Sequence, residues 1–233
     1  MKEIWKESCI FSPSLICLDM CNLEEQVRIL ERSGVGMLHV DILDGHFSPS
    51  MPLGLDTVRQ LRARTDLAFD CHVMVTEQDY FVNELLDIGV EQITFHAETQ
   101  PHIDGMLNRI HERGVRAGIA LKPSTPLSVL DYVLDKCDTV LLMLINPGYA
   151  SVKGEKQAAY APRKIRDLRK QIRNRGLDTK IEVDGRIAPQ NIADYGKEDV
   201  DIFVTGSTCM DRADMEGSLK KLQELRRSVI GGI

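Results

Sequence analysis

The sequence lacks several features that mark whole classes of protein. No run of about 18 apolar residues occurs, so we expect no membrane-spanning helix. The start, Met1–Lys6, carries an acidic residue and no long apolar run, so we expect no signal peptide. No Gly-x-Gly-x-x-Gly follows the first apolar run, which argues against a dinucleotide-binding open sheet. The net charge of −6 argues against a nucleic-acid-binding protein, because such proteins usually carry a basic surface.

Cysteine is present, but not at the spacings of a disulfide or zinc framework. The six cysteines are scattered, include no Cys-x-x-Cys pair and mostly lie in apolar runs. We interpret them as reduced thiols of a cytoplasmic protein.

What the sequence does contain is a regular alternation of apolar runs and amphipathic segments. The expected strands are Cys9–Cys17, Met37–Leu43, Leu67–Met74, Gln92–His96, Arg116–Leu121, Thr139–Ile145, Lys180–Val183 and Asp201–Thr205. The expected helices are Leu23–Ser33, Leu53–Arg64, Asp79–Ile88, Ile103–Arg113, Pro126–Asp135, Ala159–Arg175, Pro189–Tyr195 and Met215–Arg227. This alternation predicts a parallel sheet covered by helices. Eight units in 233 residues predict an α/β fold, a single (β/α)8 TIM barrel that forms one domain over residues 1–233.

Polar side chains with metal-binding chemistry fall at the ends of several expected strands. His39 and Asp41 are two residues apart in one strand, so they point to the same face. His72 and Asp184 lie near the ends of two other strands, and the active site of such a barrel lies at the C-terminal strand ends. Nitrogen and oxygen donors of this kind suit one divalent ion, Zn²⁺, Fe²⁺, Mn²⁺ or Co²⁺, and do not choose among them.

Two polar residues at the end of the fourth strand have an open role. His96 and Glu98 can support a metal ligand or serve the structure alone, and the sequence does not decide between these roles. Met74 and Met143 are by default core residues.

An ordered set of motifs runs along essentially the whole chain. The motifs are Ser12-Pro13-Ser14-Leu15, His39-Val40-Asp41-Ile42-Leu43-Asp44-Gly45-His46-Phe47, Asp70-Cys71-His72-Val73-Met74, His96-Ala97-Glu98, Ala120-Leu121-Lys122-Pro123, Asn146-Pro147-Gly148-Tyr149, Glu182-Val183-Asp184-Gly185 and Gly206-Ser207. With these motifs the sequence resembles the ribulose-phosphate 3-epimerases and their hexulose-phosphate relatives.

The resemblance implies a metal-dependent isomerase with the (β/α)8 fold that acts on a phosphorylated ketose and forms a homo-oligomer. It places the metal ligands at His39, Asp41, His72 and Asp184, and the acid/base pair at Asp41 and Asp184. The residues expected to contact the substrate are Ser12, His72, Met74, Met143, Gly148, Gly185, Arg186, Gly206 and Ser207.

Departures from the family pattern are concentrated where a phosphate would bind. A glycine pair and a glutamine usually follow the Asn-Pro-Gly motif, and this chain has Ala150–Lys156 instead. Arg186 replaces the usual second glycine after Asp184. Because guanidinium binds phosphate through two parallel hydrogen bonds, we expect Arg186 to contact the phosphate. The alternative is that it turns outward and pairs with a surface acid such as Glu182 or Asp211.

Epimerisation at carbon 3 of a ketose requires removal of a proton next to a carbonyl group. Two carboxylates can act as base and acid on opposite faces, while a divalent ion stabilises the enediolate. We therefore predict 3-epimerisation of the ribulose 5-phosphate/xylulose 5-phosphate type. The alternatives are a hexulose 6-phosphate (allulose 6-phosphate) 3-epimerase, a phosphate-binding barrel without turnover, and a metal-dependent aldolase or decarboxylase on this fold.

Overall fold

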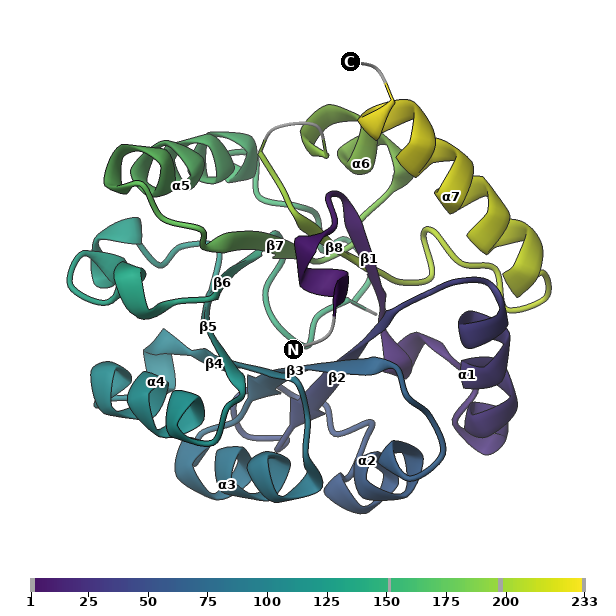
Figure 1. Ribbon diagram of the computed structural model, residues 1–233, viewed down its shortest axis with the longest axis horizontal. Helices are drawn as coiled ribbons and strands as arrows, with labels where there is room; N and C mark the ends of the chain where they lie inside the picture. The colour runs from purple at the N-terminus through teal and green to yellow at the C-terminus, as the bar shows by residue number, and fades with distance from the viewer. Residues whose placement is uncertain (1–2, 151, 197–198, 232–233) are drawn as a thin grey trace.

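Parallel strands form a closed barrel, and the α-helices lie outside it (Figure 1). The computed structural model describes residues 3–150, 152–196 and 199–231. The eight strands follow the order β1-β8-β7-β6-β5-β4-β3-β2, and a parallel bridge between Ser14 and His39 closes the ring. The strands are β1 (Ile10–Pro13), β2 (Met37–Leu43), β3 (Ala68–Met74), β4 (Gln92–His96), β5 (Arg116–Leu121), β6 (Thr139–Met143), β7 (Lys180–Asp184) and β8 (Ile202–Thr205). The α-helices are α1 (Leu23–Arg32), α2 (Leu55–Arg62), α3 (Gln78–Ile88), α4 (Ile103–Glu112), α5 (Ala161–Arg175), α6 (Pro189–Tyr195) and α7 (Met215–Ile230).

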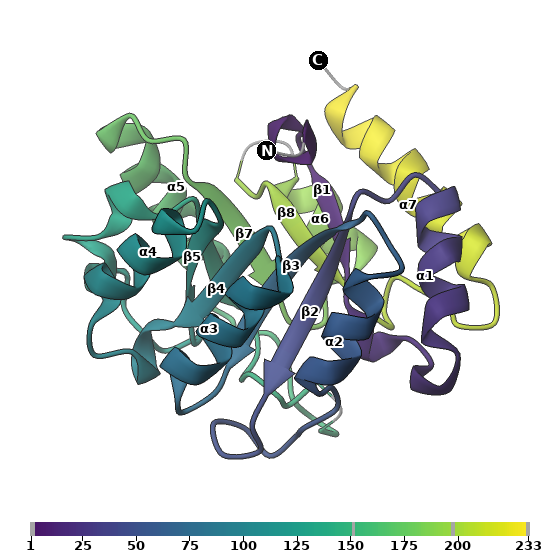
Figure 2. The same cartoon turned by 60° about the horizontal axis from the view of Figure 1, so that its bottom comes forward.

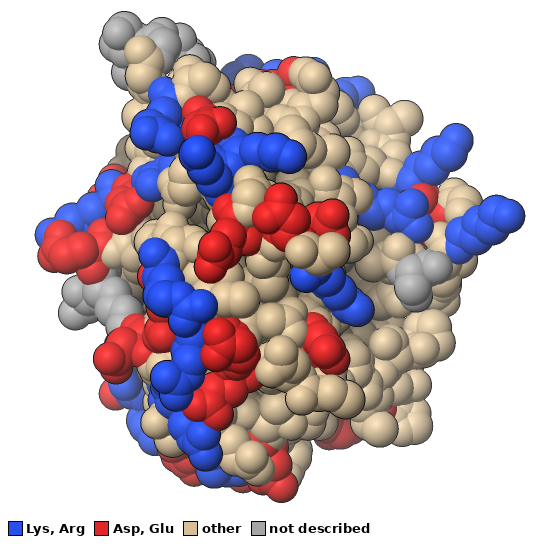
Figure 3. All heavy atoms as spheres, turned by 90° about the vertical axis from the view of Figure 1, so that its right-hand side faces the viewer, with Lys and Arg blue, Asp and Glu red and all other residues tan. Residues whose placement is uncertain are grey.

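The helices pack around the outside of the barrel, as Figure 2 shows in a tilted view. They bury apolar residues against the barrel and leave polar residues outside. In α1, Val27 and Leu30 are buried, while exposed Glu24 and Arg28 form an i, i+4 ion pair of 2.7 Å. On the face seen in Figure 3, acidic and basic side chains lie next to one another. No helix in the described ranges has the length and apolar character needed to cross a membrane.

The N-terminal end of the barrel is closed by an apolar plug. The 3-10 helix η1 (Glu3–Lys6) places Trp5 at this end, where its side chain is buried. Trp5 belongs to a cluster with the first residues of four strands, Ile10, Met37, Ala68 and Ile202. This plug blocks access to the barrel interior from the N-terminal end.

One expected helix is wrong. The segment Pro126–Asp135 forms no α-helix; two short 3-10 helices, Leu127–Leu130 and Leu134–Lys136, take its place. Pro126 has an extended backbone with ψ 152°, and the following residues include β-branched Val129 and Val133, which are poor helix formers. The other expected helices and all eight strands are confirmed to within a few residues at most ends. The exception is the first strand, which ends at Pro13 because the chain turns inward at Leu15.

Candidate active site

The strand registers bring the predicted ligands to neighbouring levels of the barrel. In the β2–β3 pair, Asp41 lies opposite His72, and His39 lies opposite Asp70. Asp184 is the last residue of β7. Because side chains two residues apart share a face, His39 and Asp41 both point into the barrel at successive levels.

The four predicted ligands form one cluster. His39, Asp41, His72 and Asp184 each offer a donor atom, and these atoms all lie within 4.8 Å of one another. Nε2 of His39 is 3.3 Å from Oδ1 of Asp41. Nδ1 of His72 is 3.4 Å from the same oxygen and 3.9 Å from Oδ2 of Asp184.

The chemistry of this cluster fits a divalent cation. Nε2 of His39 and Nδ1 of His72 are buried and form no hydrogen bond within the described ranges. A buried polar atom without a partner is costly, and two imidazoles with two carboxylates are a common donor set for a divalent ion. The residues therefore fit one such ion, which the two unpartnered nitrogens and the two carboxylates would hold.

The pKa shifts in the cluster indicate that positive charge is favoured there. Burial raises the pKa of Asp184, and the Asp41 carboxylate raises it further. The pKa of Asp41 is lowered, because the effects of His39 and His72 outweigh that of burial. Burial alone would lower the pKa of His39, but the carboxylates of Asp41 and Asp70 raise it well above its usual value.

A buried polar layer beneath the cluster orients His39. Nδ1 of His39 lies 2.9 Å from Oδ2 of Asp70. Asp70 also accepts hydrogen bonds from Gln92 at 2.8 Å and from Ser12 at 3.3 Å. Because Asp70 accepts the proton of Nδ1, Nε2 of His39 is left free to face Asp41.

Glu182 belongs to the same buried layer. Its Oε1 lies 3.3 Å from Nδ1 of His39, and the side chain is fully buried. Burial raises the pKa of Glu182 well above its usual value, and neighbouring Asp70 adds to this shift. The suggestion that Glu182 is a surface acid paired with Arg186 is therefore wrong. Since Glu182 precedes Asp184 by two residues in β7, strand alternation could have placed it in the interior.

Of the two serines of the first motif, Ser14 is the one at the site. Its hydroxyl donates to Oδ2 of Asp41 at 2.8 Å, and it lines the cavity above the cluster. Ser12, the expected substrate contact, is fully buried beside Asp70 and is not among the cavity-lining residues. Ser14 follows the last residue of β1. Because the site of such a barrel lies at the C-terminal strand ends, the later position of Ser14 in the sequence was the signal that favoured it over Ser12.

Above the cluster lies a cavity of about 820 Å³. Besides Asp41 and Asp184, it is lined by these expected contact residues: Met74, Met143, Gly148, Gly185, Arg186, Gly206 and Ser207. Fully buried His72 lies beneath it, in the cluster. Cys17 and Arg212 also line the cavity, and the motifs did not indicate them. Which of these residues contact a substrate stays a prediction.

The loop after β7 has a constrained backbone at the edge of this cavity. Gly185 has φ +117°, and a Cβ there would lie 2.7 Å from Cγ1 of Ile145, so only glycine fits. Next to it, Arg186 donates from Nη2 to the carbonyls of Ala150 and Val152, each at 2.9 Å. Arg186 thus lines the cavity while tying the β7 loop to the loop after β6.

His96 and Glu98 extend the cluster on the β4 side. His96 is fully buried, with Nε2 2.9 Å from Nε2 of His72 and Nδ1 2.8 Å from Oε2 of Glu98. Burial lowers the pKa of His96 to about 4. Although burial raises it, the pKa of Glu98 falls to about 2 because of hydrogen bonds from His96 and the turn after β5.

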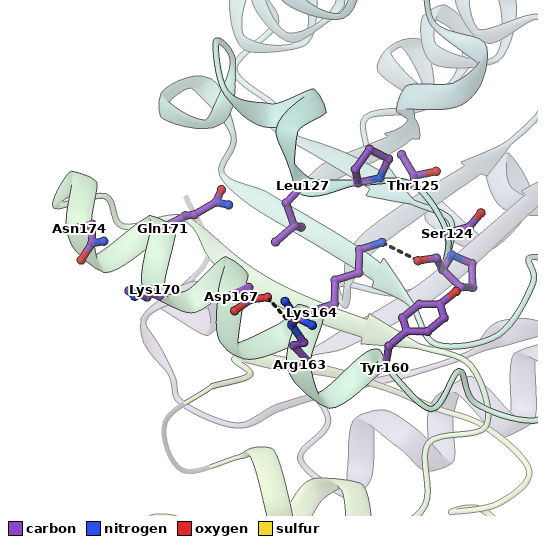
Figure 4. Close-up of a pocket in the computed structure, with 12 residues that line it drawn as sticks. Ser124, Thr125, Leu127, Tyr160, Arg163, Lys164, Asp167, Lys170, Gln171 and Asn174 are labelled. Carbon is purple, nitrogen blue, oxygen red and sulfur yellow. Dashed lines mark hydrogen bonds and ion pairs between the residues drawn. The ribbon is translucent and has the colours of Figure 1, made fainter.

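A second cavity, of about 750 Å³, lies away from the cluster. It is bounded by Ser124–Leu127 and by one face of α5 (Figure 4). Lys164 reaches from α5 to the turn after β5, where Nζ donates to the carbonyls of Lys122 at 2.8 Å and Pro123 at 3.0 Å. Burial lowers the pKa of Lys164 to about 8. None of the four clustered ligands lines this cavity.

The fold and the cluster together define a (β/α)8-barrel protein with a candidate metal centre at the catalytic end of the barrel. The model of the ribulose-phosphate 3 epimerase family matches residues 10–210, and the chain belongs to this family. Ribulose-phosphate 3-epimerase of Escherichia coli (strain K12) is 35% identical over 218 residues, covering 93% of this chain and 94% of the relative. The chloroplastic ribulose-5-phosphate-3-epimerase of Arabidopsis thaliana is 35% identical over 224 residues, covering 95% and 79%.

A solved structure supports the fold independently. The crystal structure of 3-hexulose-6-phosphate synthase from Salmonella typhimurium aligns with a TM-score of 0.68, covering 94% of this chain and 99% of the other. With 16% identity, this similarity concerns the fold alone.

Proposed function

We propose that this chain catalyses metal-dependent epimerisation at carbon 3 of a phosphorylated ketose, of the ribulose 5-phosphate/xylulose 5-phosphate type. The chain belongs to a family of epimerases, and its curated relatives carry the name ribulose-phosphate 3-epimerase. The observation that carries the proposal is the cluster of His39, Asp41, His72 and Asp184 at the floor of the cavity.

In this proposal the two cavity-lining carboxyl groups are the acid and the base. Asp41, whose pKa is lowered, is ionised and removes the carbon-3 proton. Asp184, whose pKa is raised, delivers a proton to the opposite face. Because the reaction is reversible, the two residues exchange roles in the other direction. Ser14 orients Asp41 by donating to its Oδ2.

The proposed cofactor is one divalent ion, held by the four clustered residues. When bound, it supplies positive charge beside the ketose oxygens, where negative charge develops as the proton leaves. Zn²⁺, Fe²⁺, Mn²⁺ and Co²⁺ all suit this donor set, so elemental analysis of the purified protein is the direct way to identify the ion.

The decisive experiment is an exchange assay in D₂O on paired substrates. We expect the carbon-3 hydrogen of ribulose 5-phosphate to exchange with solvent as xylulose 5-phosphate forms, and we expect chelation to stop both. A higher kcat/KM for allulose 6-phosphate than for ribulose 5-phosphate would instead assign the hexulose reaction. This reaction is the second candidate because Ala150–Lys156 departs from the usual family sequence. Carbon–carbon cleavage products in the NMR spectrum would reject epimerisation in favour of an aldolase or decarboxylase.

Two further expectations concern the protein as a whole. All six cysteines are free, which accords with the proposed cytoplasmic location. We also propose that each chain forms one domain and that the chains assemble into a homo-oligomer. Light scattering on the purified protein measures the number of chains in the assembly.

A further inference from the structure

A chain of hydrogen bonds leads away from the metal cluster on the side opposite His39. It runs from His72 to His96 and then to Glu98, with distances of 2.9 Å and 2.8 Å. Both imidazoles are fully buried, and only 19% of the Glu98 side chain is exposed. The proposed acid/base chemistry uses neither His96 nor Glu98, so these contacts need another explanation.

Counting protons along this chain fixes the state of each ring. A carboxylate only accepts hydrogen bonds, so Nδ1 of His96 carries a proton and donates to Glu98. Burial favours the neutral ring, which leaves Nε2 of His96 without a proton and able to accept. Nε2 of His72 must then be the donor. A neutral His72 with its proton on Nε2 has a free lone pair on Nδ1, the atom that faces Asp41 and Asp184.

The outer end of the chain is fixed by the turn after β5. Oε1 of Glu98 accepts hydrogen bonds from the backbone amide of Lys122 at 2.7 Å and from the hydroxyl of Thr125. Lys164 braces the same turn from α5 through the carbonyls of Lys122 and Pro123. Figure 4 shows its side chain reaching from α5 to this turn. Glu98 is therefore held in place independently of His96.

The ring of His96 is also held from its face. The ring of Phe47 packs against it with a centroid distance of 4.5 Å. Nζ of Lys122 lies 4.1 Å from the centroid of the Phe47 ring, on the same side of the barrel. His96 is therefore constrained by two hydrogen bonds and an aromatic contact, as a residue that orients another one must be.

We propose that His96, held by Glu98, is a positioning residue that keeps Nδ1 of His72 unprotonated and directed at the cluster, and so tightens the binding of a divalent ion there. This inference rests on the proposed metal site. Partners that orient a ligand imidazole typically change metal affinity by about 10–100-fold when they are lost.

The proton positions can be measured without any substitution. In metal-free wild-type protein labelled with ¹⁵N-histidine, long-range ¹H–¹⁵N spectra should show His72 with its proton on Nε2 and His96 with its proton on Nδ1. A His72 protonated on Nδ1 while its ring is neutral would overturn the proposal.

Metal affinity tests the function of the chain. In His96→Leu the acceptor for His72 is lost, and we expect the Kd of Zn²⁺, measured by competition with a chromophoric chelator, to rise by about 10–100-fold. In His96→Gln the side-chain carbonyl can still accept, so we expect a smaller rise. Glu98→Gln gives a second, milder variant if His96→Leu does not fold. A folded His96→Leu or Glu98→Gln that binds Zn²⁺ as tightly as wild type would overturn the proposal.

His111→Leu is the matched control. His111 forms a histidine–carboxylate pair with Asp138 at 2.9 Å, but on the surface, where 39% of its side chain is exposed. Its loss should leave the Zn²⁺ affinity unchanged.

These results separate the positioning role from the reaction itself. Weaker Zn²⁺ binding in the His96 variants supports the positioning role even if no phosphoketose is turned over. Wild-type epimerisation together with unaltered Zn²⁺ affinity in those variants rejects the positioning role and leaves the proposed function intact. A wild-type protein that binds no divalent ion rejects both proposals.

Discussion

Asp41 and His72 lie opposite each other across β2 and β3, with Oδ1 of the carboxylate 3.4 Å from Nδ1 of the imidazole. The same oxygen lies 3.3 Å from Nε2 of His39, and Ser14 occupies the other oxygen. Asp41 thus lies next to both imidazoles, and in the proposed reaction it is also the base. A change at Asp41 should affect ion binding and proton transfer together.

The first prediction concerns the two carboxylates. Asp41→Asn and Asp184→Asn should each slow exchange of the carbon-3 hydrogen by at least about 10²–10⁴-fold, the usual contribution of a general acid or base. NMR in D₂O with ribulose 5-phosphate measures the exchange. Asp56→Asn, a change at an exposed residue of α2, is the control and should exchange normally. Wild-type exchange in both site variants would disprove the assignment.

The second prediction concerns removal of the ion. Because the proposed divalent ion would bind the folded chain and not the unfolded one, chelation should lower the Tm as well as the activity. A thousandfold excess of ion over Kd contributes about 4 kcal/mol to the free energy of unfolding. Differential scanning calorimetry with and without added Zn²⁺ or Mn²⁺ measures this. In His72→Ala the added ion should raise the Tm much less. An equal rise in that variant would mean that His72 is not a ligand.

The third prediction concerns Arg186. Arg186→Ala should raise KM for a phosphorylated ketose far more than for its unphosphorylated analogue, because a guanidinium at the cavity edge can pair with a phosphate. Steady-state kinetics on both substrates measure the difference. Arg163→Ala, at an exposed position on α5, should change neither value. If Arg186→Ala raises both KM values equally, Arg186 serves only to hold the Ala150 and Val152 carbonyls.

The fourth prediction concerns pH. His96 has a pKa of about 6.5 in an unfolded chain and about 4 in the folded one, because of burial. Between these pH values the ring of His96 binds more protons in the unfolded chain than in the folded one, so the contribution of His96 to stability falls as the pH drops from about 6.5 to about 4. Across this pH range the shift in the pKa of His96 corresponds to a change of about 3 kcal/mol in the free energy of unfolding. Urea unfolding of the metal-free protein at several pH values measures the slope, which should be flatter in His96→Gln. An unchanged slope would show that other groups cause it.

Local patterns were sufficient to predict the barrel and the four clustered residues. His39 and Asp41 share a strand at a spacing of two, and this spacing directs both to the same face of the strand. The strand–helix alternation predicted the fold because each β-run is followed by a helix-forming segment. The prediction of a helix at Pro126–Asp135 was wrong because the helical pattern there is weaker than the effects of the proline and the β-branched residues.

Contacts between distant strands could not be predicted in the same way. The alternative for Arg186 treats Glu182 as a surface acid, but the buried environment of Glu182 is set by contacts with His39 of β2 and Asp70 of β3. Ser12 and Ser14 have the same chemistry, and only the point at which β1 ends decides which one meets Asp41. The link from His96 to His72 depends on ring orientations that no spacing in the sequence specifies.

The closure of the barrel has a consequence for how the chain folds. In the described ranges β1 and β2 share a single bridge, Ser14 to His39, whereas β2 and β3 are paired along seven residues. This bridge joins a residue that holds Asp41 to one of the clustered imidazoles. We therefore expect this sparsely paired seam to seal late in folding, and an open barrel would not hold the four clustered residues together. An ion held by ligands on β2, β3 and β7 would connect the two sides of this seam, and should slow its reopening.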